Sequence, residues 1–136
     1  MHRTPIQLRF GDVDMLGHVN NVAYASYVET ARVEFLRSLG QPVQSIIVAH
    51  LALDYRRPVH YGRALHVDTW MEKLGRTSVT LGQVVWADED RAAEVRSVLV
   101  WYDYDRGAPT VVSDAMRAAL SEYAADRHDQ GTGDGG

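Results

Sequence analysis

Apolar residues between positions 21 and 39 recur at steps of three and four, the period of an amphipathic helix. The main apolar face consists of Tyr24, Val28, Ala31, Phe35 and Leu39. Tyr27 and Val33 widen this stripe, and the charged residues lie mostly on the other side: Glu29, Arg32, Glu34 and Arg37. Asn20 or Asn21 can cap the start, and Gly40 can end the helix. The pattern therefore predicts one well-buried helix of about five turns over residues 21–39.

The pattern changes to alternation after Gly40, which predicts four strands. Their sequences are SIIVAHLALDYR, ALHVDTWMEKL, RTSVTLGQVVWAD and AAEVRSVLVWYDYD, and a shorter strand, IQLRF, precedes the helix. RRPVHYG links the first two strands, and the links EKLGRTS and DEDR are short and turn-like. We therefore expect an antiparallel meander. A last helix, DAMRAALSEYAAD, follows Ser113 as its cap.

One early helix followed by at least four long antiparallel strands predicts an α+β domain, in which the sheet buries the apolar face of the helix. We expect a single domain over residues 1–126. The tail, residues 127–136, is polar and glycine-rich and is expected to be disordered. The strands carry more aromatic surface than one helix can cover, which favours a homo-oligomer. These aromatic residues are Trp70, Trp86, Trp101, Tyr102 and Tyr104.

Composition gives no support to several classes of protein and rules out cysteine chemistry. The 136 residues fit one domain, and the net charge of -4 gives no support to a nucleic-acid or membrane-surface partner. No apolar run approaches the roughly 18 residues of a membrane span. There is no cysteine, so disulfides and thiolate chemistry are ruled out. Since the opening MHRTPIQLRF also lacks the apolar core of a signal peptide, a cytoplasmic location is favoured.

The stretch GDVDMLGHVNN, Gly11 to Asn21, is unusual because it gathers two aspartates, a histidine and two asparagines just ahead of the predicted helix. A calcium loop fits poorly, since its fifth and twelfth positions would be Leu16 and Ala23, which carry no ligand atom. The chain also lacks the G-x-S-x-G and H-E-x-x-H motifs of serine hydrolases and zinc peptidases.

Carboxylate chemistry at a helix start is the remaining catalytic interpretation. The unpaired N–H groups and partial positive charge at a helix N-terminus stabilise an anion or a developing oxyanion. An aspartate there stays ionised and suits the role of nucleophile, or of water orienter, against an activated carbonyl such as a thioester. The alternative is structural: Asp12, Asn20 and Asn21 only cap turns and the helix, and His18 is a bystander.

At these residues the chain resembles hotdog-fold acyl-CoA thioesterases of the 4-hydroxybenzoyl-CoA thioesterase type. The family pattern, D-x-D-x-x-G-H-V-N-N-x-x-Y, is complete here. Its fixed positions are Asp12, Asp14, Gly17, His18, Val19, Asn20, Asn21 and Tyr24. The segments DYRRPVHYGRALHVDTW and KLGRTSVTLGQ are also similar to the family, so the resemblance covers about Thr4 to Tyr123.

The resemblance implies a hotdog fold, an antiparallel sheet wrapped around a long central helix, with its active site between subunits of a homodimer or homotetramer. Asp14 would be the catalytic nucleophile or general base, and backbone N–H groups would polarise the thioester carbonyl. The acyl chain would enter between the helix and the partner subunit. Neither a metal nor a redox cofactor is implied.

The other residues that the resemblance assigns to the site have supporting roles. Gly17, Asn21 and Tyr24 would bind substrate, and the pantetheine arm would meet Arg76, Thr77 and Ser78. Plant acyl-carrier-protein thioesterases have a similar motif with an asparagine where this chain has Leu16. That difference favours Asp14 over an asparagine–histidine mechanism and leaves His18 to hold the loop or to help move a proton.

Three functions are therefore compatible with the sequence. The first is hydrolysis of a fatty or aromatic acyl-CoA. A hotdog hydratase or dehydratase is the second, although that chemistry requires a histidine paired with an acid, which the order of residues here fits poorly. The third is a non-catalytic acyl-CoA binding protein. Coenzyme A and acyl carrier protein share the pantetheine arm, so the carrier stays open.

Overall fold

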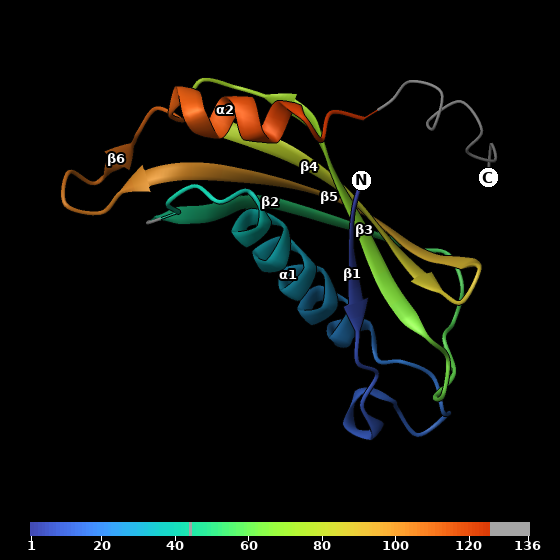
Figure 1. Ribbon diagram of the computed structural model, residues 1–136. Coiled ribbons are helices and arrows are strands. Elements are labelled where there is room, and N and C mark those ends of the chain that lie inside the picture. The colour runs from blue at the N-terminus through green and yellow to red at the C-terminus, as the bar shows by residue number, and fades with distance from the viewer. Residues whose placement is uncertain (44, 126–136) are drawn as a thin grey trace.

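The sheet consists of antiparallel strands in the order β1-β3-β4-β5-β2, with a sixth short strand, β6, paired to β5. The computed structural model describes residues 1–43 and 45–125, so the tail at 127–136 lies outside the described residues. The elements are β1 (His2–Ile6), a 3₁₀ turn η1 (Phe10–Asp12), α1 (Asn21–Ser38), β2 (Ile46–Tyr55), β3 (Leu65–Leu74), β4 (Ser78–Ala87), β5 (Asp90–Asp103), β6 (Ala108–Pro109) and α2 (Asp114–Ser121). Figure 1 shows α1 lying against one face of the sheet, which confirms the α+β class.

Helix α1 begins and ends close to the predicted positions. The Asn20 side chain accepts a hydrogen bond from Val22 N at 2.9 Å, and Gly40 follows the helix with a φ of 71°. Two assignments of helix faces were wrong. Arg32 is buried although it was placed among the polar positions, because it lies one turn beyond the buried Val28. Val33, expected in the apolar stripe, is 40% exposed.

The first strand and one strand pairing differ from the sequence prediction. β1 is His2–Ile6 rather than IQLRF, because His2 to Ile6 pair with Thr69 to Leu65 of β3. Only β3, β4 and β5 form the expected meander. β2 does not pair with β3, the next strand in sequence, but with β5. The link RRPVHYG thus crosses from β2, at one edge of the sheet, to β3, next to the strand at the other edge.

The C-terminal helix is shorter than predicted. Ser113 caps it as expected, accepting from Met116 N at 3.2 Å, but α2 ends at Ser121. The chain then turns to the edge of β3, where Met71 N donates to the Tyr123 carbonyl at 2.8 Å. Since the β1 pairing stops at Thr69, this edge position is open to the C-terminal segment.

The interior has two apolar clusters along α1, one at each end. The first packs Val28 and its neighbours near the start of the helix. The second packs Phe35 with α2 and also contains Trp101, one of the aromatic residues counted as more than one helix can cover. Between them, Gln83 Nε2 donates to the Val28 carbonyl and to Thr69 Oγ1, both at 3.1 Å. Because these groups are buried, their hydrogen bonds tie the middle of the helix to the sheet.

Gly82 offers a test of packing on the outer face of the sheet. A Cβ at this position would lie 2.5 Å from Trp70 Cε2 and 2.6 Å from Glu72 Oε1. We expect Gly82→Ala to lower the free energy of unfolding by about 1–3 kcal/mol through this overlap, measured by urea unfolding. Gly11→Ala is the matched control, since nothing lies within 4 Å of its Cβ. Equal stability of the two variants would contradict the proposed packing.

Candidate active site

The unusual stretch forms a tight turn between η1 and α1. Gly17 has a φ of 82°, which favours glycine, and its N–H donates to the Asp14 carbonyl at 3.1 Å. Asp14 N donates to the His18 carbonyl at 2.8 Å. The turn is therefore closed by its own backbone, and it places Asp14 at the surface.

The Asp14 carboxylate is held by the same turn through one of its two oxygens. Oδ1 accepts from Leu16 N at 2.9 Å and from His18 N at 3.2 Å. Among residues 1–43 and 45–125, no group donates to Oδ2. The side chain is thus oriented by backbone donors, while the second oxygen is left for a water or a substrate.

Asp12 has a different role from Asp14, because its carboxylate is buried. Oδ2 accepts from the Tyr27 hydroxyl of α1 at 2.8 Å and from Arg9 N at 3.1 Å. Desolvation by burial acts to raise the pKa of Asp12, but these hydrogen bonds and the Arg9 charge outweigh it and lower the pKa. Asp12 therefore fastens the start of the loop to the helix.

The His18 ring lies against another imidazole instead of the candidate carboxylate. Its centroid is 4.6 Å from that of His60, with the planes at 72°. Only the His18 backbone bonds to Asp14, so this chain contains no Asp14–His18 side-chain dyad.

The helix start lies directly after this turn. Asn20 N donates to the Asp12 carbonyl at 2.7 Å, and Asn21 is exposed. Asn21 N–H, the first in α1, has no acceptor within the part of the chain that the structure describes. Tyr24, which the resemblance assigns to substrate binding, is 3% exposed and belongs to the core, and its ring contacts that of the exposed Tyr55.

The second group of predicted site residues lies far from this loop. Arg76, Thr77 and Ser78 are at the β3–β4 turn, where Arg117 of α2 donates to the Arg76 carbonyl at 3.2 Å. The Asp14 loop lies beside the opposite end of β3, and Figure 1 shows the two at opposite ends of the sheet. A ten-residue strand spans about 30 Å, so one chain does not bring both groups together.

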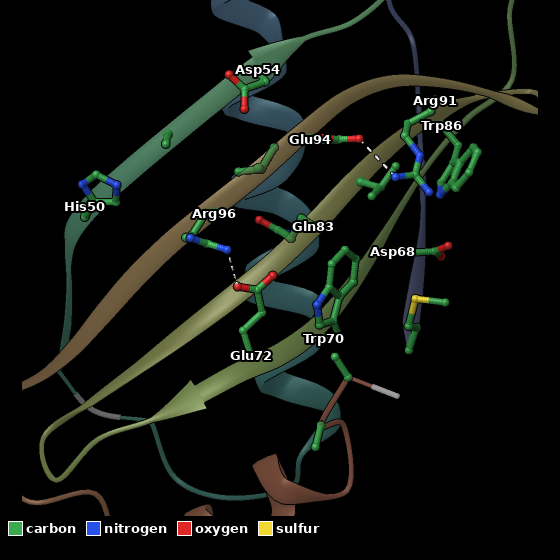
Figure 2. Close-up of a pocket in the computed structure, with 16 residues that line it drawn as sticks. His50, Asp54, Asp68, Trp70, Glu72, Gln83, Trp86, Arg91, Glu94 and Arg96 are labelled. Carbon is green, nitrogen blue, oxygen red and sulfur yellow. Dashed lines mark hydrogen bonds and ion pairs between the residues drawn. The ribbon is translucent and has the colours of Figure 1, made fainter. Parts of the chain in front are cut away.

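A groove of about 600 Å³ lies on the other face of the sheet, away from α1 (Figure 2). Its walls include Trp70 and Trp86. Four of its charged groups pair within the groove: Arg96 with Glu72 at 3.0 Å and Arg91 with Glu94 at 3.1 Å. No residue of the Asp14 loop lines the groove, so the two are separate sites.

Sequence reasoning missed two contacts of the loop. Tyr27 was read only as part of the apolar stripe, although its hydroxyl binds Asp12. The HY pair of RRPVHYG, His60 and Tyr61, was read only as part of a link, although both rings contact residues of the loop region. Local spacing carries no signal for the second contact, since His18 and His60 are brought together only by folding.

The chain belongs to the Thioesterase-like superfamily, whose sequence profile matches residues 8–120. A thioesterase from Thermus thermophilus, solved with coenzyme A and Zn, is 34% identical, with a TM-score of 0.80 over 87% of this chain and 95% of that one. A predicted thioesterase from Bacillus stearothermophilus is 29% identical, with a TM-score of 0.84 over 91% of this chain and 96% of that one. The chloroplastic acyl-acyl carrier protein thioesterase ATL2 of Arabidopsis thaliana is 22% identical over 131 residues, which are 90% of this chain and 69% of that protein.

These similarities support the hotdog architecture and thioester hydrolysis in general. Two further findings concern only the described residues. They contain no group of three or more histidine, aspartate or glutamate side chains placed to hold a metal ion. None of their helices is long and apolar enough to cross a membrane.

The Asp12–Tyr27 hydrogen bond generates a prediction about stability and pH. Tyr27→Phe should lower the free energy of unfolding by about 1–2 kcal/mol at pH 7, because a buried carboxylate loses a donor. The folded-state pKa of Asp12 is lowered, so its contribution is present above the usual value near 3.9 and is lost as the pH falls through the folded value. Urea unfolding should show the difference shrinking in acid, whereas Tyr104→Phe, at an exposed tyrosine, should have no effect at either pH. A constant difference from pH 7 to pH 2 would contradict the assignment.

Proposed function

We propose that this protein is an acyl-CoA thioesterase of the 4-hydroxybenzoyl-CoA thioesterase type, and that Asp14 is its catalytic carboxylate. The observation that carries the proposal is the hydrogen bonding of the two Asp14 carboxylate oxygens. Backbone donors fix Oδ1, while Oδ2 has no donor within the described residues. Helix α1 starts a short way along the chain, and its first N–H, that of Asn21, has no acceptor among those residues. Such an arrangement combines an oriented carboxylate with a donor for a developing oxyanion.

The reaction adds water to an acyl thioester and yields a carboxylic acid and the free thiol. As a general base, Asp14 Oδ2 would take a proton from the attacking water while Asn21 N–H stabilises the oxygen of the tetrahedral intermediate. Collapse of the intermediate breaks the C–S bond, and the thiolate leaves and is protonated. As a nucleophile, Oδ2 would instead form an anhydride that water opens. In a single turnover in ¹⁸O water, label in Asp14 would identify the nucleophilic route, because it enters the side chain only when water opens the anhydride at the aspartyl carbonyl.

The hydratase alternative needs a histidine paired with an acid. The His18 ring packs on His60 and forms no side-chain bond with Asp14, which favours hydrolysis over hydration. Gly17 then serves as the turn residue, and His18 supplies backbone groups that hold Asp14.

The carrier is coenzyme A in this proposal. Support comes from the Thermus thermophilus relative, which was solved with coenzyme A. The Arabidopsis relative is an acyl-acyl carrier protein thioesterase, so both carriers belong in the same assay.

A homodimer explains the separation of the two groups of site residues. β2 is an edge strand with exposed apolar side chains, including Val48 at 45% and Leu51 at 40%. Two-fold symmetry at this edge would place the partner's β2 antiparallel to β2, so that the two sheets point in opposite directions. The partner's Arg76, Thr77 and Ser78 would then come to the end where Asp14 lies, ready to meet the pantetheine arm. The outer groove with Trp70 and Trp86 would allow two such dimers to pair as a tetramer.

The first prediction from this proposal concerns Asp14. Asp14→Asn should reduce kcat/KM for the best acyl-CoA by about 100-fold or more, because the amide keeps the acceptor but cannot act as base or nucleophile. Thiol release from short, long and aromatic acyl-CoAs, and from acyl carrier protein thioesters, measures this, and the chain has no cysteine to interfere. An unchanged urea unfolding curve controls for the fold. Full activity of Asp14→Asn would refute the catalytic assignment.

The second prediction concerns the composite site. Asp14→Asn and Arg76→Glu, each inactive or weak alone, should recover roughly a quarter of wild-type activity when co-expressed, because half of the dimers then hold one intact site. Co-expression of Asp14→Asn with the double variant Asp14→Asn/Arg76→Glu is the control and should recover nothing. No recovery in the first mixture would refute a site shared between Asp14 of one chain and Arg76 of its partner.

A further inference from the structure

Two adjacent residues in the link between β2 and β3, His60 and Tyr61, contact the candidate catalytic loop at two points. The His60 ring meets the His18 ring at 4.6 Å in an edge-to-face arrangement. The Tyr61 ring meets Phe10, at the start of η1, at 5.8 Å with the planes at 85°. The two contacts lie on either side of Asp14 in the sequence.

Backbone contacts accompany the rings. His18 and His60 form an isolated antiparallel bridge, and Val19 N donates to the Val59 carbonyl at 2.7 Å. Val59 is 1% exposed and belongs to the core. The turn from Asp14 to His18 is otherwise bonded mainly to itself, so the segment 59–61 supports it from outside.

The supporting segment is itself fixed to the sheet. Arg63 Nη2 donates to the Ala87 carbonyl at 2.7 Å and to Asp90 at 2.9 Å. Asp88 N donates to the Ala64 carbonyl at 2.7 Å. The segment therefore connects the loop to the β4–β5 turn, where sheet geometry holds it.

The rings of His60 and Tyr61 lie at the surface and add little to the core. His60 is exposed, Tyr61 is 55% exposed and its partner Phe10 is 78% exposed. Exposed ring pairs are weak contacts, yet they are directional and favour one ring arrangement over others. Contacts of this kind suit the orientation of a surface turn better than the stabilisation of a fold.

We propose that His60 and Tyr61 are positioning residues, which hold the turn so that Asp14 presents its free oxygen in one orientation. The inference rests on the proposed function of Asp14 as the catalytic carboxylate. His60 acts through ring packing on His18, and Tyr61 through ring packing on Phe10. A small displacement of a reacting group costs a large factor in rate, so loss of either ring lowers turnover rather than substrate binding.

Kinetics of paired variants test the proposal. His60→Ala and Tyr61→Ala should each lower kcat by about tenfold with KM nearly unchanged, whereas His60→Phe and Tyr61→Phe, which keep a ring, should retain most of the rate. Tyr104→Ala is the matched control, because Tyr104 is also exposed, at 64%, and also forms an edge-to-face pair, with Tyr102 at 5.1 Å. Wild-type kcat in the alanine variants would overturn the proposal. Equal loss in His60→Ala and His60→Phe would overturn it for His60, because imidazole chemistry would then matter rather than ring packing.

Amide hydrogen exchange gives a readout that needs no substrate. In His60→Ala, the Leu16 and His18 N–H groups, which hold the Asp14 carboxylate, should exchange faster than in wild type, while His60→Phe and Tyr104→Ala should match wild type. Unchanged exchange in His60→Ala would overturn the positioning role even if Asp14→Asn were inactive. If the wild type cleaved no thioester, the proposed function would fail, and exchange would still decide whether His60 holds the turn.

Discussion

The Asp12 carboxylate is buried at the junction of η1 and α1, where it must be satisfied by hydrogen bonds because a buried charge without partners is costly. Tyr27 supplies one donor from the second turn of α1, and Arg9 N supplies another from the chain before η1. The Asp12 carbonyl also accepts from Asn20, the cap of α1. One residue thus fixes both ends of the loop, and the geometry around Asp14 depends on it.

The sheet and α1 provide the frame in which this junction forms. Apolar clusters pack each half of the helix, and Gln83 ties its middle to the strands through the Val28 carbonyl. This frame also separates the ends of the molecule. The Asp14 loop lies beside one end of β3, and the residues proposed for the pantetheine arm follow the other end. A site built from both groups would need a second copy, which in the proposed dimer joins at the exposed edge strand β2.

Much of the candidate site could be read from the sequence because its residues are close together in the chain. The spacing from Asp12 to Asn21 predicted a turn before a helix, and the structure has that turn, with Gly17 at positive φ and Asn20 as the cap. The orientation of His18 could not be read in this way. Its ring points to His60, which is 42 positions further along, and only the pairing of the two backbone segments places the rings together.

The sequence by itself determined the α+β class, the position of α1 and the segments that form β2 to β5, because side-chain period and capping residues act locally. Tertiary structure decided the register of β1, the pairing of β2 with β5 and the burial of Arg32 and Trp101. Strand partners are chosen by long-range hydrogen bonds and shared burial, and a local period of two is compatible with several neighbours. The same reason separates Asp14 from Arg76: their distance follows from the length and direction of β3 in the folded sheet, which local patterns do not specify.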